Sequence, residues 1–248
     1  MKQFAIIGLS RFGQRILEEL IDVNCEILII DKSREIIEIY KDKVASAYVA
    51  DAINEEIINK LVPQTIDAAV VDLGDKLEVS ILVTNYLKKM GIKKIIAKAE
   101  TDEHAEILRL VGATQIIFPN REAAKRIAPL LISSLLFSYL PISRELVIAE
   151  IKVPEELIGK TLIEANLRQK HRLNVVAFRK ENESDYSYFA PDYRLEDDDI
   201  FLVAAKETDI ESYTGTEVAE GGKQKISNLF KRFFTRFKEG EKGGNNNS

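Results

Sequence analysis

The stretch from residue 4 to residue 31 constrains the fold of this chain more than any other. A short apolar segment at residues 4–7 runs directly into the sequence GLSRFG, and apolar residues at helical spacing follow as far as Ile21. A second apolar segment, residues 26–30, ends at Asp31. The pattern changes from that of a buried strand to that of an amphipathic helix and back again. The sequence therefore predicts one strand–helix–strand unit with a carboxylate at the exit of its second strand.

The glycines of this unit suit a diphosphate, because backbone N–H groups and a helix N-terminus receive negative charge where no side chain blocks the approach. Gly8 and Gly13 occupy the first and last glycine positions of the GxGxxG pattern. Ser10 stands at the middle position, where its N–H and hydroxyl can still contact a phosphate. Asp31 follows at close to the ~20 residues expected for an acid that binds ribose hydroxyls. Such a carboxylate favours a free 2′-hydroxyl over a 2′-phosphate, and the neighbouring Lys32 works against that preference. The alternative is a strand–turn–helix whose glycines serve only close packing.

The composition excludes several other classes of protein. A chain of 248 residues has room for two domains, and 46% hydrophobic with 30% charged residues is ordinary for a globular protein. The net charge of −5 argues against nucleic-acid binding. Two histidines and one cysteine cannot supply a zinc site. The sequence shows neither a signal peptide nor a run long enough to span a membrane, so we expect a cytoplasmic protein.

Strand and helix patterns continue to alternate after Asp31, which predicts a doubly wound parallel α/β sheet of six strands. Asp51 follows the third strand, where it could bind a ribose or an adenine amino group, or could cap the next helix. The further strands are expected at residues 45–49, 68–73, 94–99 and 115–118, and the helices at 34–41, 55–61, 76–90 and 103–111.

A different pattern begins after the sixth strand. Residues 121–140 read as one long helix, and its second half is apolar almost all round, which predicts packing on its own sheet and on a second subunit of a homodimer. A small α+β unit follows, with strands expected at 145–153, 174–179, 186–189 and 200–205. The acidic residues 196–199 lack the alternating ligands of a calcium loop and are interpreted as a solvated turn.

The end of the chain carries a basic amphipathic helix pattern. Apolar residues recur at helical spacing over 226–237, five cations lie on the opposite face, and Gly221 and Gly222 precede the segment as a hinge. Such a helix suits an anionic membrane surface or a groove on a partner protein. The alternative is a terminal helix docked on its own domain.

A nucleotide-binding fold does not by itself make an enzyme. The two histidines, His104 and His171, have no sequence neighbours that suggest a catalytic relay, and the second domain is small for a substrate domain. The sequence therefore favours a nucleotide-responsive regulator. The alternatives are an NAD-dependent oxidoreductase and a membrane-associated nucleotide sensor.

Several motifs, in their order along the chain, resemble the RCK family. The glycine turn, Asp31, the pair Asp51-Ala52, the pair Lys98-Ala99 and the run GATQIIFP at residues 112–119 are similar to the N-terminal RCK domain, TrkA-N. The sequences IGKTL, NVVA and DIFLV at residues 158–162, 174–177 and 199–203 resemble the C-terminal module, TrkA-C. The resemblance predicts a Rossmann-like nucleotide-binding domain over residues 1–140, a TrkA-C domain over 141–215, and a hinge with the basic helix over 216–248.

The family resemblance implies a function. TrkA/KtrA-type proteins are cytoplasmic regulatory subunits of potassium uptake systems, without enzymatic activity. Their dimers assemble into a ring, commonly an octamer, beneath a membrane potassium-conducting subunit of the TrkH/KtrB type. ATP or ADP, or NAD(H), binds in the N-terminal cleft and gates ion flow. The resemblance places this chain in the cytoplasm, at the inner face of the cell membrane through its partner.

The resemblance also assigns roles to particular residues. Asn120 stands where some members carry an acid implicated in binding a divalent cation such as Mg²⁺, and Glu122, two residues on, is a candidate to replace it. Some C-terminal modules bind a cyclic dinucleotide, and the sequence leaves that open here. The residues carried over as nucleotide-binding are Gly8, Ser10, Arg11, Phe12 and Gly13 for phosphates, Asp31 and Lys32 for the ribose, Asp51 and Ala52 for the adenine, Asp72, Leu73 and Gly74 for the fourth-strand wall, and Lys98 and Glu100 for the terminal phosphates.

Overall fold

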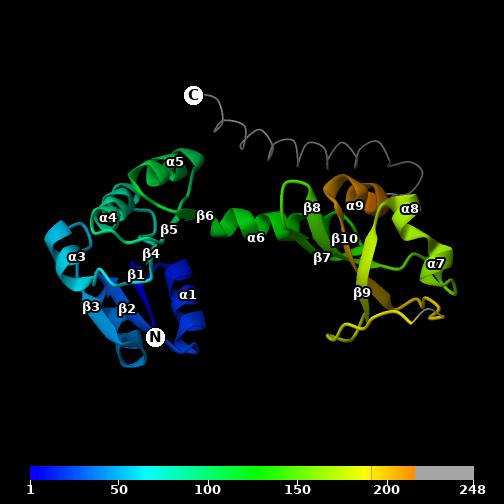
Figure 1. Cartoon of the computed structure of the whole chain (residues 1–248), viewed down its shortest axis with the longest axis horizontal. Helices are drawn as coiled ribbons and strands as arrows, with labels where there is room; N and C mark the ends of the chain where they lie inside the picture. The colour runs from blue at the N-terminus through cyan, green and yellow to red at the C-terminus, as the bar shows by residue number, and fades with distance from the viewer. Residues whose placement is uncertain (191, 216–248) are drawn as a thin grey trace. The chain divides into compact units, whose positions relative to one another are not determined.

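The computed structural model describes residues 1–190 and 192–215, so the predicted basic helix over 226–237 lies outside the described residues. The chain divides into two compact units, the first covering Met1–Pro119 and the second beginning at Asn120 (Figure 1). Within the described ranges, no helix combines the length and apolar character needed to cross a membrane.

The first unit is built on a six-stranded sheet with the order β3-β2-β1-β4-β5-β6, in which all neighbours are parallel. This order confirms the predicted doubly wound fold. The chain adds β2 and β3 on one side of β1 and then crosses over to add β4, β5 and β6 on the other side. The strands are β1 (Lys2–Ile7), β2 (Cys25–Asp31), β3 (Ser46–Val49), β4 (Ala68–Val71), β5 (Ile95–Lys98) and β6 (Gln115–Ile117).

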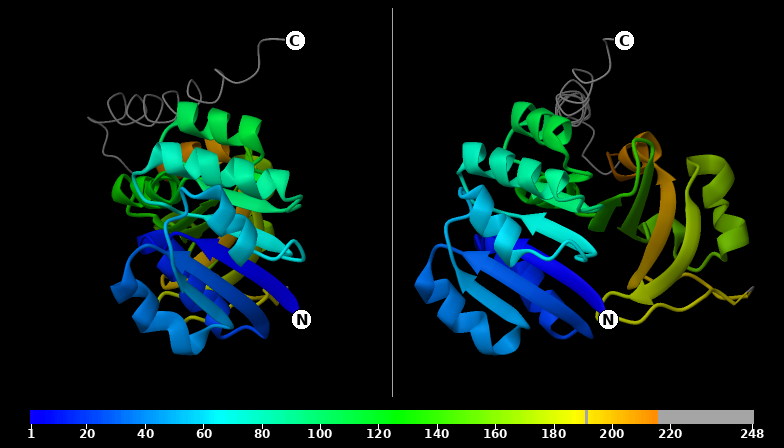
Figure 2. Two further views of the ribbon diagram at one scale, coloured as in Figure 1. Left: turned by 90° about the vertical axis from the view of Figure 1, so that its left-hand side faces the viewer. Right: turned by 60° about the vertical axis from the view of Figure 1, so that its left-hand side comes forward.

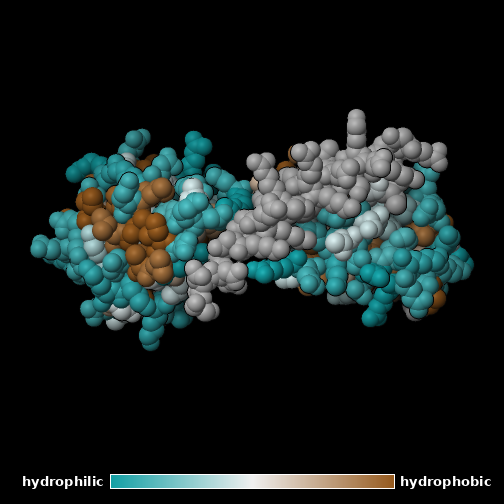
Figure 3. Space-filling model, turned by 90° about the horizontal axis from the view of Figure 1, so that it is seen from above, coloured by the Kyte–Doolittle hydropathy of each residue, from teal (hydrophilic) through white to brown (hydrophobic). Residues whose placement is uncertain are grey.

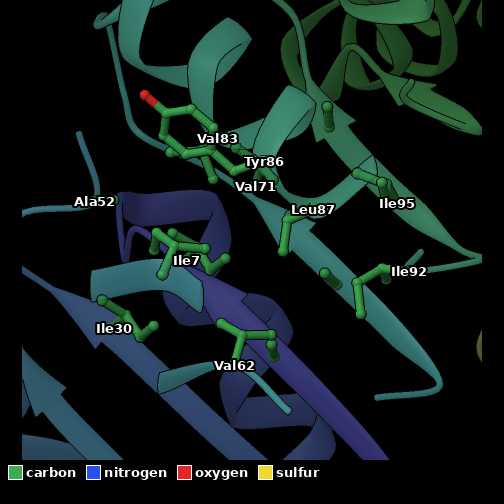
Figure 4. Close-up of a cluster of buried hydrophobic side chains, with 14 of the residues drawn as sticks. Ile7, Ile30, Ala52, Val62, Val71, Val83, Tyr86, Leu87, Ile92 and Ile95 are labelled. Carbon is green, nitrogen blue, oxygen red and sulfur yellow. The ribbon is translucent and has the colours of Figure 1, made fainter. Parts of the chain in front are cut away.

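Helices cover both faces of this sheet (Figure 2). Ile6, Ile29 and Val70 point to the face covered by α1 and α2. The opposite face packs on α3, α4 and α5, and its core includes Ile7 and Val71 from the sheet (Figure 4). Because the strands are buried on both faces, they read as continuous apolar runs. The helices are α1 (Arg11–Ile21), α2 (Arg34–Tyr40), α3 (Glu55–Leu61), α4 (Leu77–Lys89) and α5 (Asp102–Val111), with a short 3₁₀ helix η1 (Lys41–Lys43).

The second unit contains a four-stranded antiparallel sheet with the order β7-β8-β10-β9. Ile151 and Phe201 are fully buried in its core. The strands are β7 (Leu136–Pro141), β8 (Leu146–Lys152), β9 (Asn174–Lys180) and β10 (Asp199–Lys206). The helices are α6 (Pro119–Ile127), α7 (Leu162–Ala165), α8 (Leu167–His171) and α9 (Glu207–Thr214), with 3₁₀ helices η2 (Ala128–Leu131) and η3 (Glu155–Leu157).

The long helix predicted over residues 121–140 is wrong in its second half. The helix α6 ends at Ile127, and residues 136–141 form strand β7, which pairs with β8. Leu136 and Tyr139 are buried in the second core, and the register of the strand shifts between Leu136 and Ser138. This irregularity breaks the two-residue alternation that identifies a strand. The homodimer argument that rested on a helix with two apolar faces therefore does not hold.

Two smaller expectations for the second unit also fail. Residues 186–189 form no strand and contribute one isolated bridge between Ser187 and Phe178. The acidic turn is not wholly solvated, because Asp199 is fully buried and accepts hydrogen bonds from the Tyr193 hydroxyl and the Glu196 N–H. Lys180 forms ion pairs with Glu196, Asp198 and Asp199, and together these carboxylates raise the pKa of Lys180 despite its partial burial.

Candidate functional site

The turn between β1 and α1 lies against the carboxyl end of β4. Gly8 adopts φ +82°, and a Cβ atom at this position would lie 2.2 Å from the backbone oxygen of Asp72. A side chain here is therefore excluded both by the backbone conformation and by the close approach of β4. At Gly13, a Cβ atom would lie 2.8 Å from the Gly8 oxygen. Both motif glycines thus serve close packing of the turn, as the alternative reading of the motif requires.

Asp72 is the buried acid beneath this turn. Its Oδ2 accepts a hydrogen bond from the Gly13 N–H at 2.6 Å and another from the Ser10 hydroxyl. Its side chain is fully buried, and Oδ1 has no hydrogen-bond partner. The Lys98 ammonium lies 3.5 Å from that oxygen and 2.8 Å from Glu100 Oε1. Ser10, the residue that replaces the middle glycine, is therefore tied to a carboxylate of this chain.

Lys98 keeps its charge in this environment. Burial alone would lower the pKa of Lys98, but the hydrogen bond to Glu100 and the charges of Asp72 and Glu100 raise it above its ordinary value. The Lys98 cation therefore offsets part of the charge of the Asp72 carboxylate beneath the turn.

Asp31 holds the turn from the β2 side. Its Oδ2 accepts from the Leu9 N–H at 2.7 Å, and its Oδ1 accepts from the Ser33 N–H at 2.7 Å. The Gly8 N–H also donates to the Ile30 backbone oxygen at 2.8 Å. The acid predicted to bind a ribose thus lies beside the glycine turn, with both of its oxygens already accepting backbone hydrogen bonds.

Of the two readings left open for Asp51, the structure excludes the helix cap. The N-cap of α3 is Asn54, whose side chain accepts from the N–H groups of Glu56 and Ile57. Asp51 is exposed, and its carboxylate accepts a hydrogen bond from the Ile53 N–H, at 3.1 Å. Asp51 lines the pocket described next.

A pocket of about 220 Å³ opens at the carboxyl ends of β1, β2, β3 and β4, where open α/β sheets bind ligands. Eight of the residues carried over from the family line it: Ser10, Asp31, Lys32, Asp51, Ala52, Asp72, Leu73 and Gly74. Six do not line it: Gly8, Arg11, Phe12, Gly13, Lys98 and Glu100. Sequence reasoning missed a further group of lining residues: Leu9, Ile30, Ser33, Ile36, Ala50, Lys76 and Val79.

The residues outside the pocket still lie around it. Gly8 and Gly13 shape the turn, and Lys98 is joined to the turn through Asp72. Arg11 is exposed at the first position of α1, where the amide groups of the first helical turn have no acceptor within the helix. The Gly13 N–H already donates to Asp72, so the donors that remain for a phosphate chain are the Arg11 and Phe12 amides and the Arg11 side chain.

Among the lining residues that the sequence did not predict, Lys76 is the one whose charge interacts with other lining residues. The side chain and the charge of Lys32 lower the pKa of Lys76, while the charges of Asp51 and Asp31 raise it to a smaller extent. Lys76 follows Gly74 by two residues at the carboxyl end of β4, and this position was the available sequence signal.

The histidines form packing contacts. The buried His104 places Nε2 2.7 Å from the Ser80 hydroxyl, which itself donates to the Leu77 backbone oxygen, and burial lowers the pKa of His104. The His171 ring packs against Tyr213 with centroids 5.0 Å apart. Throughout the described parts of the chain, no group of three or more His, Cys, Asp or Glu side chains is arranged to hold a metal ion.

This strand order, with a glycine turn and an acid at the end of its second strand, is the architecture of Rossmann-type proteins, here joined to a small antiparallel module. The TrkA-N domain family matches residues 4–119, and the TrkA-C domain family matches residues 146–214. The chain belongs to the RCK family of TrkA-N plus TrkA-C proteins, which includes the Ktr system potassium uptake proteins. The resemblance seen in the sequence motifs is confirmed.

Two relatives come from Bacillus subtilis (strain 168). The chain is 32% identical to Ktr system potassium uptake protein C over 86% of this chain and 96% of that protein. It is 29% identical to Ktr system potassium uptake protein A over 86% of this chain and 95% of that protein. Both relatives are named as potassium uptake proteins of the Ktr system, so the homology is to components of a transport system and not to enzymes.

The fold is also similar to that of a solved channel structure. The GsuK channel bound to NAD superposes with a TM-score of 0.58 at 16% identity, over 85% of this chain and 38% of that chain. At this level of identity the similarity concerns the fold.

Proposed function

We propose that this chain is the nucleotide-binding regulatory subunit of a potassium uptake system and gates a membrane potassium-conducting subunit of the TrkH/KtrB type. The observation that carries the proposal is the pocket at the carboxyl edge of the parallel sheet, bounded by the glycine turn and Asp31, in a chain of the Ktr-related family. The chain would then work at the inner face of the cell membrane, through that partner.

The pocket suits an adenine nucleotide. Gly8 lets the turn pack closely on β4, the Arg11 and Phe12 amides lie in the first turn of α1 as donors for a phosphate chain, and Asp31 and Asp51 line the pocket with oxygens that can accept from hydroxyl or amino groups. The ligand we propose is ATP, ADP or NAD(H), and the NAD bound to the GsuK channel supports the last of these. Glu122 belongs to no group of three or more metal-ligating side chains within the described residues. A divalent cation would therefore bind together with the nucleotide, through its phosphates.

Gating requires an assembly that has two arrangements. Leu82 on α4 and Ile107 and Leu110 on α5 are exposed, Leu110 to 80%, and a hydrophobic patch is visible on the first unit (Figure 3). Exposed apolar surface of this kind marks a protein interface, which supports assembly into a homo-oligomeric ring. A nucleotide then gates the partner only if it binds one arrangement of the ring more tightly than the other.

Titration calorimetry of the full chain with ATP, ADP and NADH, with and without Mg²⁺, tests the nucleotide site. We expect one nucleotide bound per chain, and we expect Asp51→Asn to weaken binding about fivefold, the effect of about one hydrogen bond. Asp42→Asn, an exposed aspartate outside the pocket, is the matched control and should change nothing. Failure of all three nucleotides to bind would contradict the proposed function.

The same preparation tests the partner. Membrane extracts of the source cell, passed over the immobilised chain, should yield an integral membrane potassium-conducting subunit, and ATP and ADP should change potassium flux differently in vesicles that contain the reconstituted pair. Tight nucleotide binding without such a partner would instead support a nucleotide sensor unconnected to potassium.

Arg11 is a candidate sensor of the third phosphate. It is exposed at the first residue of α1, so a guanidinium–phosphate contact adds to the first-turn amides. We expect Arg11→Ala to weaken ATP binding about tenfold and ADP binding much less, as measured by calorimetry. Arg15→Ala is the control, since Arg15 lies one turn later and pairs with Glu18 at 2.6 Å. Equal losses for both nucleotides would refute the role of Arg11.

A further inference from the structure

A buried histidine joins two helices of the first unit. The helices α4 and α5 pack side by side, and Val83 and Ala105 contribute to one core between them and the sheet (Figure 1). His104 is the third residue of α5 and only 4% exposed, and its Nε2 atom lies 2.7 Å from the hydroxyl of Ser80 on α4. The proposed nucleotide site makes no use of this contact.

The hydrogen bonds around Ser80 fix the tautomer of His104. The Ser80 hydroxyl has a single proton and donates it to the Leu77 backbone oxygen at 2.7 Å, so it accepts from His104. The Nε2 atom therefore carries the ring proton, and Nδ1 carries a lone pair. Nδ1 is buried, and no described residue forms a hydrogen bond with it. A second proton on this ring can enter only at Nδ1.

The charges around the ring do little to favour that proton. Glu100, in the loop before α5, is the group whose charge attracts it, and the Glu100 carboxylate is already paired with the Lys98 ammonium at 2.8 Å. The contact from α4 comes from Ser80, which is neutral. The other acids close to the ring in sequence are exposed to solvent: Glu78 on α4, and Asp102 and Glu103 on α5.

A proton on His104 therefore places a cation and an unpaired N–H group in a buried position, and both are costly. Burial lowers the pKa of His104 below its ordinary value of 6.5, against a smaller opposite effect of Glu100. A lowered histidine pKa contributes stability that is complete above the unfolded value and is lost as the pH falls through the folded value. The packing of α5 on α4 thus weakens below about pH 6.5.

We propose that the contact between Ser80 and His104 is a proton-sensitive latch, which holds α5 on α4 while the ring is neutral and releases α5 when Nδ1 takes up a proton. The exposed residues Ile107 and Leu110 on α5 belong to the surface that the proposed function assigns to assembly. Opening of α5 moves both of them, so acid speeds the exchange of subunits. This effect on assembly rests on the proposed function, whereas the latch itself does not.

Amide hydrogen exchange of the full chain at pH 8 and pH 6 tests the latch. The readout is the exchange rate of α5 amides divided by that of α1 amides, since α1 packs on the other face of the same sheet. We expect this ratio to rise about fourfold at pH 6, the factor by which protonation at an ordinary pKa of 6.5 favours the open form. In His104→Gln, whose amide reaches Ser80 but does not titrate in this range, the ratio should not change.

The chain has only two histidines, which supplies the matched control. His171→Gln removes the other imidazole and should keep the full response of α5. A ratio in the wild type that is equal at the two pH values would overturn the latch, even if His104→Gln fails to fold. A response that survives in a folded His104→Gln chain would overturn it as well.

Mixing of labelled and unlabelled chains at the same two pH values tests the effect on assembly. We expect subunit exchange in the wild type to be about fourfold faster at pH 6, and to be unchanged in His104→Gln. Opening of α5 without faster subunit exchange would confirm the latch and overturn the assembly surface on α5. Nucleotide titration at pH 8 tests the proposed site separately, because His104 is neutral there.

Discussion

Replacing Asp72 with asparagine is expected to tighten the binding of ADP about tenfold. The Asp72 carboxylate accepts a hydrogen bond from the Gly13 N–H, the third residue of α1, so its negative charge lies beneath the helix turn that would receive the phosphates. Lys98 offsets only part of that charge, because its ammonium is closer to Glu100, at 2.8 Å, than to Asp72, at 3.5 Å. The asparagine variant removes the repulsion and leaves the cation of Lys98 for the ligand.

Calorimetric titration with ADP measures this effect, with AMP as a second ligand that carries less charge and should gain less. Asp75→Asn is the control, since Asp75 is exposed, does not line the pocket and lies in the same loop. Its charge is exposed to solvent and screened by it, so the change should alter ADP binding less than twofold. Weaker ADP binding in Asp72→Asn, in a variant whose thermal unfolding temperature equals that of the wild type, would show that Asp72 assists phosphate binding instead of opposing it.

Replacing Arg179 with methionine is expected to destabilise the second unit by about 3 kcal/mol. Glu150 on β8 is only 7% exposed, and its Oε2 accepts from the Arg179 guanidinium at 3.2 Å. Removal of the cation leaves a buried carboxylate with one remaining partner among the described residues, the Tyr186 hydroxyl at 2.6 Å. The free energy of unfolding in urea measures the loss. The double variant Glu150→Gln, Arg179→Met should recover most of it, since neither charge is then left alone.

The pH dependence separates this buried pair from a surface pair. Burial alone would raise the pKa of Glu150, but the hydrogen bonds from Arg179 and Tyr186 and the charge of Arg179 lower it below its ordinary value of 4.5. A lowered pKa contributes stability that is fully present above the unfolded value and is lost as the pH falls through the folded value. The difference in unfolding free energy between the wild type and Arg179→Met should therefore be largest at neutral pH and shrink below about pH 4.5.

Lys152→Met provides the matched control for that experiment. Lys152 pairs with Glu181 at 3.2 Å, but the two side chains are 30% and 38% exposed. Its loss should therefore change the free energy of unfolding by less than about 1 kcal/mol at any pH. A loss of similar size in Lys152→Met and Arg179→Met would contradict the importance of burial.

The first unit could be predicted from the sequence because its signals are local. Each parallel strand is a short apolar run between helical patterns. Asp31 is the last residue of β2, and Asp51 lies two residues after the end of β3. The sequence predicts a helix over residues 121–140, but residues 136–140 belong to strand β7, and this strand could not be predicted. Leu136 and Tyr139 both face the core across a register shift, so the run of apolar residues fits no two-residue period.

The interior of the site was less predictable than its outline. The sequence predicts that Ser10 contacts a phosphate, yet its hydroxyl is hydrogen-bonded to Asp72, 62 residues away in the sequence. The approach of Lys76 to Lys32 depends in the same way on how two loops meet at the sheet edge. Contacts between distant segments follow from tertiary packing, and no periodicity in either segment encodes them.

The hydrogen bonds around the glycine turn have a consequence for the energetics of ligand capture. Because Asp31 holds the Leu9 amide and Asp72 holds the Gly13 amide, the turn is complete without any bound molecule. A nucleotide at the proposed site would therefore meet a preorganised turn, and little backbone entropy would be lost on binding. Such binding would resemble rigid-body docking more than coupled folding, so the free energy of association would remain available to favour one arrangement of the proposed assembly over another.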